Sequence, residues 1–231
     1  MKKHIPNTIT CCNLISGCIA TSWALCGHYD VALLFIVIGA VFDFFDGMTA
    51  RLLHVSSPIG KELDSLADDI TFGFAPSAML FDYLNTFNTF DGLLSFRWLG
   101  YLAFVMAAFS ALRLAKFNLD ERQALGFIGL PTPANALFWG ALIVGAGDVI
   151  STIPYASWIV LAGIGISCYL LVSEIPMFAL KFKTWGWKGN EVKYVFVLSC
   201  VPILVLLGIS GLAVVIAWYV LLSAFCRNKN S

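Results

Sequence analysis

The sequence predicts an all-α fold, a polytopic membrane helical bundle of about eight transmembrane helices, with seven as the alternative. Its 231 residues are 59% hydrophobic and only 12% charged, and the mean hydropathy is +0.84. Soluble domains carry about 25% charged residues and about 45–50% apolar ones. The apolar residues also gather into long runs separated by short polar loops, and the basic residues gather in alternate loops. We expect a single integral membrane domain over residues 1–231.

Four apolar runs of spanning length fill the first half of the chain. A transmembrane helix needs about 20 mostly apolar residues, within a range of about 17–25. Runs of this kind cover residues 9–26, 31–53, 62–83 and 96–117. The turn-forming sequence Ser-Ser-Pro-Ile-Gly at residues 56–60 joins the second run to the third. These two helices should therefore be antiparallel neighbours.

The second half contains two more runs and one longer apolar stretch. A fifth run at residues 134–149 follows a proline-rich entry, and a sixth covers residues 153–180. Residues 192–226 would form a helix about 50 Å long at about 1.5 Å per residue. The hydrocarbon core of a bilayer is only about 30 Å thick. We therefore expect a helical hairpin that turns at the Gly-Ile-Ser-Gly sequence of residues 208–211.

Basic residues are distributed unevenly between the two ends of the predicted helices. If the N-terminus is cytoplasmic, 13 of the 14 basic residues fall on the cytoplasmic side, and Arg97 alone lies opposite. Cytoplasmic loops of membrane proteins carry such an excess of Lys and Arg. We therefore expect a multi-pass protein of the cell (inner or plasma) membrane whose loop 52–61 faces the cytoplasm. Membrane lipids are expected partners, and nucleic acid is not.

Four aspartates occur inside this apolar sequence, namely Asp43, Asp46, Asp64 and Asp68. Ionisable residues at membrane depth are costly and usually functional. Residues three or four apart share one face of a helix, so each of the two helices presents a pair of carboxylates. The pairs would repel each other unless a cation lay between them, and hard divalent cations take carboxylate oxygens. We predict a site for Mg²⁺ or Mn²⁺, with two ions as the favoured number.

Small and basic residues adjoin these carboxylates. Gly47 and Ala50 lie on the same stripe as Asp43 and Asp46, and they leave room for a ligand near the backbone. Arg51 lies one turn further on and can donate hydrogen bonds to phosphate oxygens. This combination suits a metal-bound diphosphate. Two metal ions about 3.5–4 Å apart would stabilise the entering and leaving oxygens of an in-line displacement.

The complete pattern from Asp43 to Asp68 is D-x2-D-G-x2-A-R-x8-G-x3-D-x3-D. It matches the signature of the CDP-alcohol phosphatidyltransferases at every fixed position, and the chain resembles that family. The resemblance implies that an alcohol attacks the lipid-linked phosphorus of a CDP-lipid and that CMP leaves. It also implies that the metal ligands are Asp43, Asp46, Asp64 and Asp68, with Asp68 also the general base. Gly47, Arg51 and Gly60 would line the CDP pocket.

Further segments resemble the bacterial and archaeal phosphatidylserine synthases of this family. They include DSLADDITFGFAP at residues 64–76 and VSEIPMFALKFK at residues 172–183. This resemblance implies CDP-diacylglycerol and L-serine as substrates and a homodimeric assembly. Asp69 departs from the pattern, since an apolar residue is expected beside the fourth aspartate. It lies about 100° round the helix from Asp68, so we do not expect it to bind metal.

Polar residues near the cytoplasmic helix ends are candidates for substrate binding. Arg113 and Lys116 lie one turn apart near the end of the fourth run, with Asn118 just outside it. We expect these three to bind the acceptor serine, with interfacial anchoring as the alternative for the two cations. Asn7 and Thr10 lie at the same depth. They could bind the CDP-lipid or could cap the first helix.

Other functions stay open at this point. One alternative keeps the chemistry but uses glycerol-3-phosphate or inositol-phosphate as acceptor, or CDP-archaeol as donor. A phosphorylated acceptor should need more cations around the cavity than Arg113 and Lys116. An alternative of another class is a transporter with an acidic intramembrane site. It is disfavoured because the acids cluster near one face with Arg51 beside them.

Overall fold

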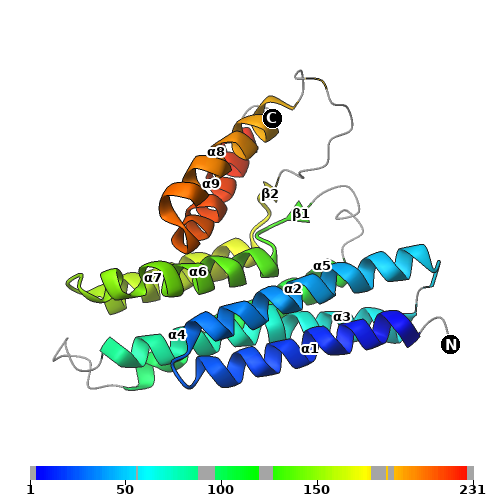
Figure 1. Cartoon of the computed structure of the whole chain (residues 1–231), viewed down its shortest axis with the longest axis horizontal. Helices are drawn as coiled ribbons and strands as arrows, with labels where there is room; N and C mark the ends of the chain where they lie inside the picture. The colour runs from blue at the N-terminus through cyan, green and yellow to red at the C-terminus, as the bar shows by residue number, and fades with distance from the viewer. Residues whose placement is uncertain are drawn as a thin grey trace.

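The computed structural model describes residues 4–55, 57–87, 97–119, 127–177, 186 and 190–227. Within these ranges the chain forms eight helical runs and one two-stranded ribbon (Figure 1). The first two runs are α1 (His4–Ala24) and α2 (Tyr29–Leu52). The third is continuous through α3 (Pro58–Asp68), the π-helical η1 (Asp69–Phe74) and α4 (Ala75–Thr86). The fourth begins as the 3-10 helix η3 (Arg97–Ala103) and continues as α5 (Phe104–Leu119). The others are α6 (Thr132–Ser151), α7 (Ala156–Val172), α8 (Glu191–Leu207) and α9 (Ile209–Arg227). The prediction of an all-α bundle of about eight helices is confirmed.

The length and composition of these helices suit a lipid bilayer. In the described ranges, Tyr29–Leu52, Trp98–Leu119 and Thr132–Ser151 are long and apolar enough to cross a membrane. Two shorter apolar helices are Ala156–Val172 and Ile209–Phe225. Many large apolar side chains of α2, α7 and α8 are exposed, as expected where hydrocarbon surrounds a helix. The chain is a polytopic membrane protein.

The helices are arranged around a core to which α1, α2, η1 and α4 to α7 contribute side chains. Figure 1 shows α1 to α5 running alongside one another, α6 and α7 lying along them, and the α8–α9 hairpin inclined to both groups. Contacts link α1 with α2, α2 with α6, and α6 with α9. The largest core side chains include Phe72, Met79, Leu80, Met106 and Trp139.

A close approach of three backbones occurs around Thr71 in η1. A Cβ atom added to Gly39 would lie 2.5 Å from Thr71 Cγ2, and one added to Gly17 would lie 2.8 Å from Thr71 Cα. Both distances are shorter than those that real Cβ atoms show, so a larger residue at either position would clash with Thr71. Glycine therefore lets α1 and α2 pack directly against η1. The Thr71 hydroxyl also donates to the carbonyl oxygen of Asn13 at 3.0 Å. Such π-helical turns inside α-helices are frequent at functional sites.

The sixth helix is shorter than the sequence analysis predicts. We expected it to reach residue 180, but α7 ends at Val172, and Ser173 has extended backbone angles. The chain then enters β2 (Pro176–Met177), which pairs with β1 (Phe127–Ile128) as an antiparallel ribbon. Pro176 disfavours helical geometry in Ile175, so the helix could not have continued to residue 180, and the chain leaves it three residues earlier. Residues 178–180 lie outside the described ranges.

The predicted C-terminal hairpin is present. Helix α8 ends at Leu207, and Gly208 has a φ of 56°, a left-handed conformation that glycine adopts without steric cost. Helix α9 then returns and packs against α6. An added Cβ at Gly145 in α6 would lie 2.7 Å from Ser210 Cα, so this glycine permits the contact.

Candidate active site

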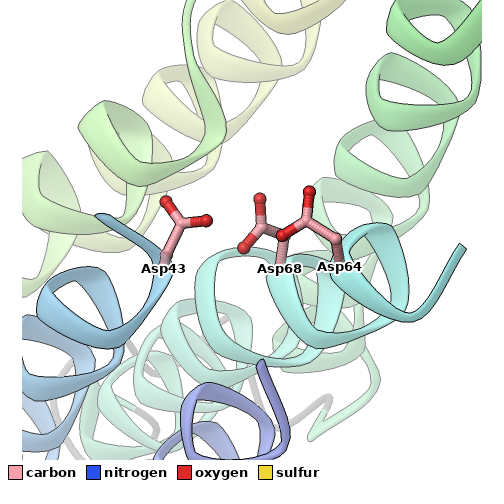
Figure 2. A group of neighbouring side chains, drawn as sticks. All are labelled: Asp43, Asp64 and Asp68. Carbon is pink, nitrogen blue, oxygen red and sulfur yellow. The ribbon is translucent and has the colours of Figure 1, made fainter. Parts of the chain in front are cut away.

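Three of the four aspartates form a compact group. Asp43 comes from α2, and Asp64 and Asp68 come from α3. One carboxylate oxygen from each residue lies within 4.8 Å of the others, and all three side chains are partly buried. Figure 2 shows the three carboxylates directed into one shared space. An all-oxygen, anionic set of this kind fits a hard divalent cation.

The fourth aspartate, Asp46, lies outside this group of three. Its side chain is only 5% exposed, and its Oδ2 atom accepts a hydrogen bond of 2.6 Å from the Thr10 hydroxyl. Thr10 belongs to α1, so this bond ties α1 to the aspartate-bearing face of α2. The structure thus brings Asp46 next to the site with one oxygen already held. A role for Asp46 as a metal ligand stays a prediction.

Asn13 is a site residue that the sequence analysis missed. Its Nδ2 atom donates a hydrogen bond of 3.1 Å to Asp68 Oδ1, and the side chain is fully buried. Groups behind a metal ligand commonly orient it in this way. The available signal was its position: Asn13 is an amide within an apolar run, three residues after Thr10 and on the same helix face.

A cavity of about 320 Å³ opens beside these carboxylates. It lies between α1, α2 and the start of α3, and its lining comprises Pro6, Asn7, Thr10, Asp46, Gly47, Ala50, Val55, Ser57, Gly60, Lys61 and Asp64. Four of the five residues predicted to bind the CDP-lipid therefore line one cavity. The fifth, Arg51, is exposed and borders a neighbouring hollow with Ala50, His54 and Val55.

The two signature glycines differ in their surroundings. An added Cβ at Gly60 would lie 3.1 Å from Asn7 Oδ1 and 3.0 Å from Ser57 Oγ, so glycine here allows α3 to start close to α1. The Ser57 hydroxyl accepts a hydrogen bond from the Gly60 amide at 3.0 Å and caps α3. An added Cβ at Gly47 would meet no atom within 4 Å. Gly47 therefore widens the cavity rather than relieving a contact.

The structure separates the three residues expected to bind the acceptor. Arg113 is 7% exposed, lies 5.9 Å from the centre of the Phe117 ring, and interacts electrostatically with Asp68. Lys116 is exposed. The Asn118 amide donates to the Ser65 hydroxyl at 2.7 Å, which fastens α5 to α3. Of the three, Arg113 is the one that the structure associates with the carboxylate group.

Comparison with known sequences decides the family. The model of the family described as CDP-alcohol phosphatidyltransferase matches residues 3–225. The chain belongs to this family. The match covers every helix that contributes to the cavity and to the carboxylate group, and it confirms the predicted resemblance and the class of enzyme.

Curated relatives carry a more specific name. Three of them are called CDP-diacylglycerol–serine O-phosphatidyltransferase. The Bacillus subtilis protein is 37% identical over 173 residues, which cover 75% of this chain and 89% of that protein. The Helicobacter pylori protein is 28% identical over 242 residues, covering 97% of this chain and 95% of that protein. The Methanocaldococcus jannaschii protein is 34% identical over 148 residues, covering 64% of this phosphatidyltransferase and 62% of the relative.

Proposed function

We propose that this phosphatidyltransferase moves the phosphatidyl group of CDP-diacylglycerol to the hydroxyl of L-serine, with phosphatidylserine and CMP as products. The observation that carries the proposal is the carboxylate group of Asp43, Asp64 and Asp68 beside a cavity that the signature residues line. The names of the relatives support CDP-diacylglycerol and serine as the substrates.

The metal ions proposed for this site are Mg²⁺ or Mn²⁺. The ligands would be Asp43, Asp64 and Asp68, with Asp46 as the fourth carboxylate, and the favoured number of ions is two. When bound, the ions would offset the charge of the diphosphate and make its phosphorus more electrophilic. The carboxylates would also be relieved of their mutual repulsion, which supports a cation as part of the working enzyme.

Residues of the chain itself would bind and orient the CDP-lipid and would deprotonate the serine hydroxyl. Asn7, Thr10, Gly47 and Gly60 would surround the cytidine diphosphate in the cavity, and Arg51 would donate to its phosphate oxygens from the neighbouring hollow. Asp68, with one oxygen held by Asn13, would take the proton of the serine hydroxyl. The serine oxygen then bonds to the lipid-linked phosphorus, and the phosphorus–oxygen bond to CMP breaks. CMP departs with that electron pair.

We place the site on the cytoplasmic side of the cell (inner or plasma) membrane. The support is the charge distribution, because 13 of the 14 basic residues fall on the side of the loop that joins α2 to α3. We treat residues 1–231 as one membrane domain. A homodimer embedded among membrane lipids remains part of the proposal.

The direct test is an acceptor assay on the purified chain in vesicles that contain CDP-diacylglycerol. CMP release and the new lipid are followed with L-serine, glycerol-3-phosphate or inositol-phosphate as acceptor, and in parallel with CDP-archaeol as donor. We expect CMP and phosphatidylserine in equal amounts with L-serine and CDP-diacylglycerol. CMP release with a phosphorylated acceptor and none with serine would overturn the proposal. Serine uptake into the vesicles without CMP would favour the transporter alternative.

A further inference from the structure

Unpartnered polar atoms concentrate in one part of the protein interior. In the described ranges, seven buried side-chain nitrogen or oxygen atoms have no hydrogen-bond partner. Five of them come from η1, α5 and the start of α6, namely Asp69 Oδ1, Ser110 Oγ, Arg113 Nε, Thr132 Oγ1 and Asn135 Oδ1. Buried polar groups are normally paired, because an unpaired one loses its bonds to water. Such a concentration indicates a missing partner.

The contact between η1 and α5 brings the carboxylate and the hydroxyl of this cluster together. A Cβ atom added to Gly73 would lie 2.6 Å from Asp69 Oδ1 and 2.9 Å from Ser110 Cβ. Both side chains therefore pack against Gly73, on the side where a Cβ atom would point. Ser110 is fully buried, so its hydroxyl has no access to water.

Arg113 lies on the same buried stripe of α5 as Ser110. The two residues are three positions apart and share a helix face, and Met106 continues that face one turn earlier. The Asn135 amide of α6 donates to Met106 Sδ at 3.2 Å, and its Oδ1 atom has no hydrogen-bond partner. The α5 stripe thus carries a guanidinium and a hydroxyl. The hydroxyl lies beside Asp69, and Asn135 of α6 meets the stripe at Met106.

The charges of this cluster are those of a receptor for a zwitterion. Arg113 offers an unpartnered N–H donor, and guanidinium groups form strong hydrogen bonds with carboxylates. Asp69 and Ser110 offer unpartnered oxygens, and an ammonium group has three N–H bonds to donate. An amino acid supplies both groups on one carbon atom. A phosphorylated alcohol supplies an anion but no ammonium group, and an uncharged alcohol supplies neither charge.

We propose that Asp69, Ser110 and Arg113 form the acceptor pocket, in which Arg113 binds the α-carboxylate of L-serine and Asp69 with Ser110 binds its α-ammonium group. This proposal rests on the proposed function. The position of this pocket fits the role of Asp68 as the base, because Asp69 follows Asp68 directly and Arg113 interacts with Asp68. The serine hydroxyl is then presented toward the group that removes its proton. Asp69 becomes a specificity residue, although we expected it to have no part in the metal site.

The first test replaces the negative charge with a neutral side chain of the same shape. Asp69→Asn should raise the KM for L-serine about 10- to 100-fold, as expected for the loss of a hydrogen bond to a charged group. The KM for CDP-diacylglycerol should change little. Glycerate, which carries a hydroxyl in place of the ammonium group, is the matched analogue. The preference of the wild-type enzyme for serine over glycerate should fall in Asp69→Asn by a similar factor.

The second test addresses the other charge. Arg113→Gln should lower the preference for L-serine over ethanolamine, which lacks the carboxylate, and should leave the preference over glycerate largely intact. Asp69→Asn should show the reverse pattern. A general loss of packing would weaken both preferences together, so the crossed result separates recognition from structural damage. Asp148→Asn, an exposed carboxylate near the far end of α6, is the control and should match wild type in both preferences.

The outcomes distinguish this pocket from the function on which it rests. If wild-type enzyme releases no CMP with L-serine, the proposed function fails, and the pocket assignment fails with it. If wild type uses serine but Asp69→Asn keeps its full preference over glycerate, only the pocket is overturned. Should Asp69→Asn elute from a sizing column as aggregate, Ser110→Ala replaces it. That smaller change should raise the KM for serine about two- to tenfold, and an unchanged KM would count against the pocket.

Discussion

At the scale of single residues, the site depends on side chains that hold other side chains. Thr10 holds one oxygen of Asp46, and Asn13 holds one oxygen of Asp68. Both donors belong to α1, which contributes none of the signature aspartates. A carboxylate with one oxygen already bonded can adopt fewer orientations. It therefore loses less conformational entropy when the substrate binds.

Asp68→Asn should abolish turnover and leave CDP-lipid binding largely intact. The amide cannot take a proton from the serine hydroxyl, but it fills the same space. CMP release measures turnover, and a shift in the melting temperature on addition of CDP-diacylglycerol with Mg²⁺ measures binding. Asp30→Asn, at the opposite end of α2, is the control and should behave as wild type. CMP release at the wild-type rate would remove Asp68 as the base.

Asn13→Ala should lower kcat by about 10- to 100-fold, because a hydrogen bond to a charged group contributes about 1.5–3 kcal/mol. The KM for CDP-diacylglycerol should change less, since Asn13 does not line the cavity. Steady-state CMP release at varied donor and acceptor concentrations gives both constants. A variant that melts like wild type and retains its kcat would contradict a role for Asn13 in orienting Asp68.

At the scale of helices, η1 positions two groups at once. Its contact with α1 and α2 through Thr71 lies on one side, and its contact with α5 through Gly73 lies on another. Asp68 and Asp69 occupy the junction between α3 and this π-helical turn. These consecutive residues therefore contact different helices. Asp68 lies with the carboxylates of α2 and α3, and Asp69 lies against α5.

Gly39→Ala should destabilise the protein by about 1–3 kcal/mol, because the added methyl group would lie 2.5 Å from Thr71 Cγ2 and 2.9 Å from Asn13 Oδ1. For a chain of this size the melting temperature should fall by several degrees. Thermal unfolding in detergent measures the change.

Gly165→Ala is the matched control for this experiment. Gly165 is a glycine of α7, and an added Cβ there meets no atom within 4 Å. Alanine favours a helix over glycine by about 1 kcal/mol, so this variant should melt at or slightly above the wild-type temperature. Equal melting temperatures for Gly39→Ala and wild type would contradict the close packing of α2 on η1.

At the scale of the whole molecule, the carboxylate group lies beside the cavity between α1, α2 and the start of α3. Asp43 from α2 faces Asp64 and Asp68 from α3 (Figure 2). Thr10 of α1 lines the adjoining cavity. The arrangement of the bundle thus places anionic oxygens beside a cavity that can admit a nucleotide.

Metal removal should abolish CMP release. Chelation by EDTA followed by desalting should leave no turnover, and added Mg²⁺ or Mn²⁺ should restore it. The physical reason is that three carboxylates within 4.8 Å cannot bind a diphosphate without cations between them. The same titration with the Asp43→Asn variant should require a higher concentration of metal. Full activity after complete chelation would contradict a metal-dependent mechanism.

Much of the site could be predicted from spacing alone. Residues three or four apart on a helix share a face whatever surrounds them, and a short turn makes neighbouring helices antiparallel. These local rules place Asp43 opposite Asp64 and Asp68, and they place Gly47 and Gly60 beside the same cavity. The end of α7 could not be predicted this way. The apolar run continues past Val172, and the pairing of β2 with β1 depends on a segment about 50 residues earlier in the chain.

The amino-acid sequence by itself determined the membrane bundle, its number of helices and the aspartate-bearing pair of helices, because each follows from composition or helical period. The family followed from the resemblance of the spaced signature to a known one. Only the tertiary structure decided which distant residues join that pair. Asn13 reaches Asp68 across 55 positions, and Arg113 is buried near it while Lys116 is not. The reason is physical: helix faces are set locally, but the faces that meet depend on how closely the backbones of α1, α2, η1 and α5 can approach one another.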